Sequence, residues 1–136
     1  MPEGFSIAVA LLAMRLVAGI LFFFQGYDKL FRVRTTGVLF AFSDSLKEKK
    51  IPIPVVRVFI TLSSVIELVG GLLLALGLFR DPVLYLLMAN MVCVAFAFSV
   101  VKPMWDLGYF FPRFVLLVAL LLLPPSCDWF CLAQLF

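Results

Sequence analysis

The sequence predicts an all-α membrane protein: a transmembrane four-helix bundle with a short interfacial amphipathic helix in the first loop. Of 136 residues, 65% are hydrophobic and only 14% are charged, whereas soluble domains have about 45–50% apolar and about 25% charged residues. The mean hydropathy is +1.18, and a soluble fold of this composition would expose large apolar patches to water. The apolar runs lack the alternation of ~10-residue strands, which excludes a membrane β-barrel.

Four apolar segments are long enough to cross a bilayer as helices, which takes ~20 residues each. They cover residues 5–26, 55–79, 82–101 and 105–123. Pro82 is well placed at the start of the third span, because proline is favoured in the first turn of a helix. The spans leave no room for a separate globular domain, so residues 1–136 are expected to form one domain.

Lysine and arginine gather on one side of the predicted spans. The first loop contains Lys29, Arg32, Arg34, Lys47, Lys49 and Lys50, with Arg57 at its edge, and the third loop adds Lys102, whereas only Arg80 lies on the other side. Short loops rich in these residues stay in the cytoplasm. We therefore expect a multi-pass protein of the plasma (inner) membrane with both termini non-cytoplasmic.

The first loop contains a short amphipathic segment. Val38, Leu39, Phe42 and Leu46 share one helical face, and lysines lie beside them. This pattern is typical of a helix in the membrane interface, with its lysines near anionic headgroups. The alternative is a solvated connector.

Two opposite charges fall near the middle of the first two spans, namely Arg15 and Glu67. A charged residue at mid-membrane costs roughly 2.5–3.5 kcal/mol on insertion scales, so the sequence suggests an ion pair between them. Asn90 on the third span and Arg113 on the fourth are candidates for the same buried polar site. With Arg113 turned inward, the excess positive charge would suit an anionic or carbonyl-bearing guest such as a lipid or a quinone. The alternative is that the pair only fixes the helix register.

Small residues accompany these charges. Gly19 and Gly26 share a face with Arg15, and Gly70 and Gly71 share one with Glu67. Since small residues let membrane helices approach closely, these two faces are expected to pack together.

Several kinds of chemistry are excluded by composition. Histidine is absent and only three cysteines are present, so His-ligated haem, His-based zinc sites, Ser-His-Asp catalysis and Cys₄ clusters are excluded, and no metal site is expected. A net charge of +3, mostly in one loop, does not suggest nucleic-acid binding. Cys127 and Cys131 are a candidate redox pair on the external side, but their spacing is not C-x-x-C; the alternative is that they belong to an aromatic interface anchor.

Two motifs carry a family resemblance. The first reads Arg15-x₃-Gly19-x₂-Phe22-x₃-Gly26-x₂-Lys29-Leu30, and the second reads Glu67-x₂-Gly70-Gly71-x-Leu73 followed by Leu76-Gly77. With four spans and a long first loop, the chain resembles the DoxX family of small four-helix membrane proteins. That resemblance implies a link to membrane redox systems, because the family is named after a subunit of an archaeal thiosulfate:quinone oxidoreductase. The tail with Cys127 and Cys131 is not part of the pattern.

The expected function is that of an accessory subunit in a larger membrane complex, with a buried site that holds a lipid or quinone. One alternative is a subunit that takes direct part in quinone-linked oxidation of a small sulfur compound or thiol. Another is a non-enzymatic scaffold or assembly chaperone. A self-sufficient enzyme is not expected, since the sequence shows no flavin or nicotinamide motif and electron transfer would need a partner or a bound quinone. The expected partners are the lipid bilayer and a membrane protein; homo-oligomerisation is left open.

Overall fold

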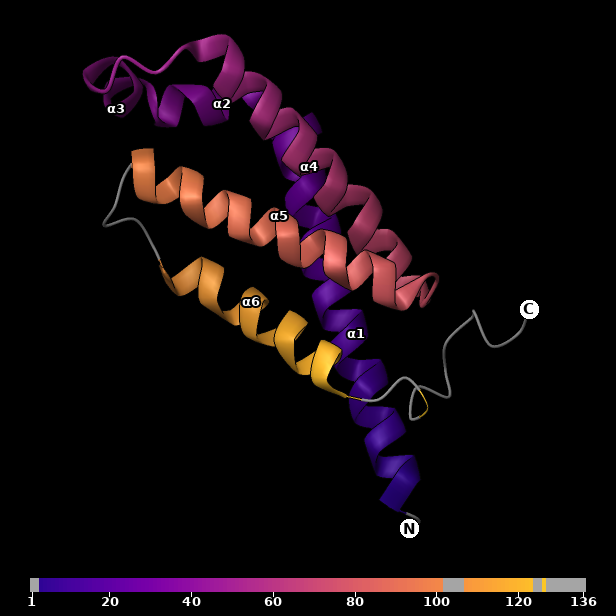
Figure 1. The fold of residues 1–136 in the computed structure, drawn as a ribbon. Coiled ribbons are helices and arrows are strands. Elements are labelled where there is room, and N and C mark those ends of the chain that lie inside the picture. The colour runs from indigo at the N-terminus through magenta and orange to yellow at the C-terminus, as the bar shows by residue number, and fades with distance from the viewer. Residues whose placement is uncertain (1–2, 102–106, 124–125, 127–136) are drawn as a thin grey trace.

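The computed structural model describes residues 3–101, 107–123 and 126. Its elements, shown in Figure 1, are α1 (Glu3–Tyr27), the π-helix η1 (Asp28–Arg32), α2 (Arg34–Ala41), α3 (Ser43–Glu48), α4 (Ile53–Leu76), α5 (Arg80–Val101) and α6 (Leu107–Leu122). These described residues contain helices and no strands, which confirms the all-α prediction. The four longest helices contact one another in a ring, in the order α1, α4, α5, α6 and back to α1.

Three helical segments are long and apolar enough to cross a membrane: Gly4–Arg32, Ile53–Leu76 and Arg80–Val101. This confirms the membrane character of the chain. The predicted fourth span corresponds to α6, which contains a shorter apolar helix at Phe110–Leu122. The fourth crossing therefore stays a prediction. So does the interfacial position of the first loop, where the structure has the two short helices α2 and α3.

The predicted end of the first span is corrected by the structure. The helix does not end at Gly26 but runs through Tyr27 and continues as the π-helix η1 to Arg32. The second helix ends earlier than predicted, at Leu76, because Gly77 adopts a left-handed conformation with φ of 71°. Glycine tolerates this conformation without steric cost and commonly ends helices in this way.

The α1–α4 interface is the most extensive helix contact, and glycines bring the two backbones together. A Cβ atom on Gly26 would lie 2.5 Å from the backbone nitrogen of Leu68, and one on Gly71 would lie 2.4 Å from that of Phe23. Apolar side chains from all four long helices pack together. The buried core consists of Leu11, Ala18, Phe22, Leu74, Val83, Leu84, Leu87, Met91, Leu117 and Leu120.

Arg80 attaches α6 to the start of α5. Its side chain is 7% exposed, and Nη2 donates hydrogen bonds to the carbonyl oxygens of Leu120 and Leu123, the latter at 2.9 Å. The last carbonyls of a helix lack partners within the helix. The guanidinium therefore caps the carboxyl end of α6 from a neighbouring helix.

We expect Arg80→Ala to lower the free energy of unfolding by about 1.5–3 kcal/mol, the range for hydrogen bonds to a charged group. Asp81→Asn is the matched control, because Asp81 is 50% exposed and its oxygen lies 3.5 Å from Arg80 Nη1, a surface contact worth ~1 kcal/mol or less. Thermal unfolding in nanodiscs measures both. Equal losses in the two variants would rule out the capping role.

Candidate ligand-binding site

The register between α1 and α4 separates the two residues that the sequence suggested as an ion pair. Gly26 lies beside Ser64 and Leu68, so Glu67 is level with Gly26. Gly19 lies beside Gly71 and Ala75, and Arg15 is one helical turn beyond. At 1.5 Å per residue, Arg15 and Glu67 are offset by about 16 Å along the helix axes.

Arg15 also projects away from Glu67, because helical side chains tilt toward the amino terminus of their own helix. The expected ion pair between Arg15 and Glu67 is therefore corrected. It rested on aligning the centres of two spans, whereas α1 continues through η1 and the helices are shifted along each other. Both residues are buried, with exposures of 2% for Arg15 and 1% for Glu67.

The ionic partner of Glu67 is Lys29 in η1. Lys29 Nζ donates to Glu67 Oε2 at 2.7 Å and to Oε1 at 3.0 Å. Lys29 is 24% exposed, so the pair lies at the edge of the interior. The hydropathy pattern predicts Lys29 in the first loop, because the apolar run ends at Gly26. The signal was present, since Lys29 continues the four-and-three spacing from Arg15 through Gly26.

Asn90 lies at the same level on α5. Gly70 of α4 is packed against Leu87 of α5. Because these helices run antiparallel, three residues back along α4 and three residues forward along α5 lead to Glu67 and Asn90, which are therefore level with each other. Asn90 is 6% exposed, and its Nδ2 atom has no hydrogen-bond partner among the described residues. A buried amide nitrogen without a partner is uncommon, because nearly all buried polar groups in proteins are satisfied.

Arg113 brings α6 to this level. The hydrogen bond from Arg80 to the Leu120 carbonyl sets the start of α5 beside the end of α6. Arg113 lies about two turns before Leu120 on α6, which brings it close to the level of Asn90 on α5. The guanidinium is partly buried, and the charge of Glu67 acts on it. One polar layer across the bundle thus consists of Lys29, Glu67, Asn90 and Arg113. Three of these residues were candidates from the sequence; the fourth candidate, Arg15, lies outside the layer.

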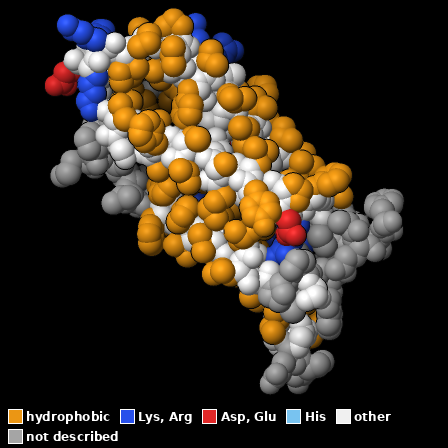
Figure 2. Space-filling model, in the orientation of Figure 1, with side chains coloured by type: hydrophobic (Ala, Val, Ile, Leu, Met, Phe, Trp, Pro, Cys, Tyr) orange, Lys and Arg blue, Asp and Glu red, His pale blue; other side chains and the backbone are white. Residues whose placement is uncertain are grey.

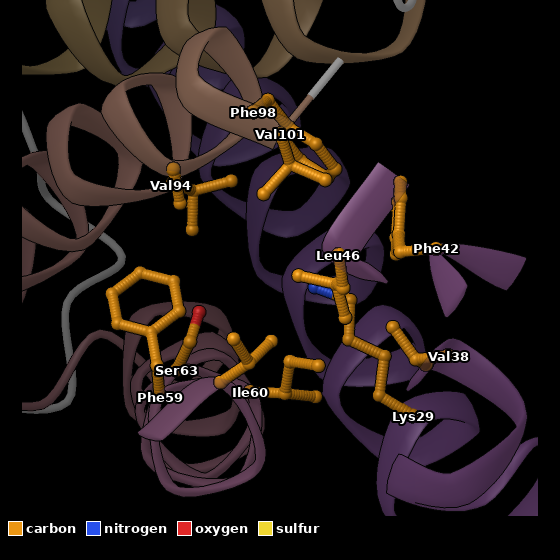
Figure 3. Close-up of a pocket in the computed structure, with 12 residues that line it drawn as sticks. Lys29, Val38, Phe42, Leu46, Phe59, Ile60, Ser63, Val94, Phe98 and Val101 are labelled. Atoms are coloured by element: carbon orange, nitrogen blue, oxygen red, sulfur yellow. The ribbon is translucent and has the colours of Figure 1, made fainter. Parts of the chain in front are cut away.

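A half-open pocket lies next to this layer, between α4 and α5 and beneath α2 and α3 (Figure 3). The space inside it that the centre of a water molecule can occupy is about 80 Å³. It is lined by Lys29, Val38, Phe42, Leu46, Val56, Phe59, Ile60, Ser63, Val94, Ala97, Phe98 and Val101. Only Lys29 and Ser63 among these residues are polar, so the pocket is an apolar chamber with two polar side chains.

Ser63 supplies the one hydroxyl in the pocket wall among the described residues. It is 5% exposed, its Oγ has no hydrogen-bond partner among the described residues, and the oxygen points toward the space between Phe59 and Val94 (Figure 3). The neighbouring Ser64 is different, because its Oγ donates to the Ile60 carbonyl at 2.6 Å. Ser63 is therefore an available donor or acceptor inside an apolar chamber.

The α2–α3 segment covers the outer end of the pocket. Leu39, Phe42 and Leu46 pack against side chains of α4 and α5, with the rings of Phe42 and Phe98 5.7 Å apart. Lys49 Nζ donates to the carbonyl of Val100 near the end of α5. The apolar face that the sequence assigned to a membrane surface thus also forms the pocket wall.

The remaining sequence-based candidates are the two cysteines near the end of the sequence. Cys127 and Cys131 are outside the described residues, so their role as a redox pair stays a prediction. Cys93 is an exposed free thiol on α5. Within the described ranges, no three Cys, Asp or Glu side chains form a group that could hold a metal ion.

Helices of membrane-spanning length around a buried polar layer and a lateral apolar pocket define an integral membrane protein with a candidate site for an amphipathic ligand. The family model named DoxX matches residues 10–100, and the chain belongs to the DoxX family. The match extends from α1 to α5 and includes Lys29, Glu67 and Asn90 but not Arg113. Searches of curated proteins and of solved structures gave no match.

Proposed function

We propose that this DoxX protein is an accessory subunit of a membrane complex and that its pocket holds a lipid or quinone. The observation that carries the proposal is the buried, unsatisfied hydroxyl of Ser63 in an otherwise apolar pocket. Ligand sites are typically apolar chambers with a few polar groups that fix the orientation of the guest. A buried polar group without a partner costs about 1–3 kcal/mol, which a guest with a suitable acceptor would offset.

Donor groups lie at the inner end of the pocket. Ser63 and Lys29 line the chamber, and the ammonium group of Lys29 has three donors, of which two are used on Glu67. The Asn90 amide lies in the layer just beneath. This donor-rich arrangement favours a guest that supplies oxygen acceptors on an apolar body, as quinone carbonyls and lipid esters do.

The accessory role follows from the chemistry that the chain offers. The candidate site holds and orients a guest, and the sequence shows no motif for a resident flavin or nicotinamide cofactor. Electrons for any quinone-linked reaction would then come from a partner protein. We therefore expect the physiological unit to be a complex in which this chain supplies the guest.

Extraction into nanodiscs with native lipid, followed by mass spectrometry of bound molecules, tests the proposal. We expect a small molecule to remain bound to the wild-type chain and its occupancy to fall about fivefold in Ser63→Ala, as expected for one lost hydrogen bond of about 1 kcal/mol. Ser99→Ala is the matched control, since Ser99 is exposed and its Oγ bonds within its own helix, to Ala95. A protein partner with no small molecule would instead support a scaffold.

The positive residues support a proposed orientation in the plasma membrane, with the α2–α3 segment in the cytoplasm. In a background with the native cysteines replaced by serine, Lys47→Cys should react with an impermeant thiol reagent only from the cytoplasmic side. Asp128→Cys, near the carboxyl terminus, should react only from outside. The reverse pattern would overturn the orientation.

A further inference from the structure

The polar groups of the pocket lie at its inner end. The register set by Gly70 and Leu87 places Ser63 level with Val94 and places Val56 level with Val101. Ser63 and Val94 adjoin the polar layer, whereas Val56 and Val101 lie near the α2–α3 segment. From Ser63 to Val56 the pocket extends about 10 Å along α4 at 1.5 Å per residue. The donors therefore lie at one end of the pocket, and the wall of the remaining two turns, roughly, is apolar.

The mouth of the pocket is also apolar. Figure 2 shows a hollow among apolar side chains near the end of the molecule that carries the lysines and arginines. The side chains that line the pocket include Phe59 and Phe98, and exposed apolar residues continue over the neighbouring helix faces. A molecule dissolved in the bilayer can reach this mouth without crossing a polar surface.

The pocket has no uncompensated charge to offer. Lys29 is the one cation in its wall among the described residues, and its ammonium group is already paired with Glu67 at 2.7 Å. Arg113, the second cation of the polar layer, does not line the chamber. An anionic guest would leave an excess negative charge in an apolar chamber, and burying an unpaired charge is strongly unfavourable.

From this arrangement we infer that the guest is a neutral, single-chain amphiphile that enters with its polar end first and places a carbonyl or hydroxyl oxygen at Ser63. The inference rests on the proposed function and narrows its ligand class. A phospholipid does not fit, because its charged headgroup would have to lose its hydration and pass the apolar walls to reach the donors. A phospholipid that entered with its acyl chain first would leave the Ser63 hydroxyl without a hydrogen-bond partner.

Binding of three probes of equal chain length to the full-length protein in nanodiscs tests the ligand class: a methyl ketone, the alkane and the fatty acid. We expect the ketone to bind about fivefold more tightly than the alkane, the effect of one hydrogen bond, and more tightly than the ionised fatty acid. Ser63→Ala should remove the preference for the ketone and leave alkane binding unchanged. Ser99→Ala should keep it.

Photo-crosslinking of the wild-type protein tests the orientation without any variant. A ketone with a diazirine beside the carbonyl should label the residues around Ser63 and Val94, and one with a diazirine at the far end of the chain should label Phe42 or Val101. Reversed labelling, or tightest binding of the fatty acid, would overturn the inference and leave the pocket as a ligand site. If none of the probes binds or labels the pocket, the proposed function itself fails.

Discussion

Gly71→Ala is expected to destabilise the bundle by about 3 kcal/mol, at the upper end of the range for overpacked sites. The new Cβ atom would lie 2.4 Å from the backbone nitrogen of Phe23 and 2.7 Å from the carbonyl oxygen of Gly19. Both are backbone atoms of α1, so neither can rotate away as a side chain would. The two helices would have to separate at the most extensive contact of the fold.

Gly70→Ala is the matched control on the same helix. Its Cβ atom would meet Leu87 Cδ2 at 2.9 Å, the flexible end of a side chain, so we expect it to cost less than half as much. Unfolding in nanodiscs measures both free energies. A loss of similar size in the two variants would show that backbone proximity does not hold α1 against α4.

The sequence could predict what depends on composition and periodicity. High hydropathy and long apolar runs indicated membrane helices, and three helical segments have the required length and composition. Glu67 and Asn90 stood out because a polar residue in an apolar span needs a reason to be there, and both are buried. These inferences need no knowledge of how one helix is placed against another.

The partner of Glu67 depended on that placement. Counting from the ends of the spans placed Arg15 opposite Glu67. In the structure the close glycine contacts fix a different register between α1 and α4, in which Gly26 lies opposite Glu67. Lys29 then reaches Glu67 only because the helix continues beyond Gly26 as the π-turn η1. Short π-helical segments are rare and frequently occur at functional sites. Neither the shift nor the π-turn follows from hydrophobic periodicity.

The pocket was equally inaccessible from the sequence. Val38, Phe42 and Leu46 were recognised as one apolar face, and a membrane surface was a sufficient explanation for it. The structure uses the same face to close a chamber whose other wall comes from α5, about fifty residues later in the chain. Whether the apolar face of an amphipathic helix lies on the membrane or on other helices of the protein depends on the tertiary structure.

A double-mutant cycle that neutralises Lys29 and Glu67 should show strong coupling between their effects on the free energy of unfolding. Glu67→Gln leaves the ammonium group of Lys29 uncompensated, and Lys29→Met leaves a carboxylate that is 1% exposed without its partner. Removing one member of a buried ion pair typically costs 3–5 kcal/mol. We expect each single variant to lose roughly this much stability, with the partial exposure of Lys29 favouring the lower end.

The double variant Lys29→Met/Glu67→Gln is expected to be more stable than the sum of the two single losses predicts, because no buried charge is left alone. The coupling free energy should be about 1–3 kcal/mol, as for residues in direct contact. Arg15→Gln combined with Glu67→Gln is the control, and its coupling should stay within about 0.5 kcal/mol because the two residues are far apart. Strong coupling in the Arg15 cycle with none in the Lys29 cycle would restore the pair that the sequence suggested and refute the helix register on which the ligand site depends.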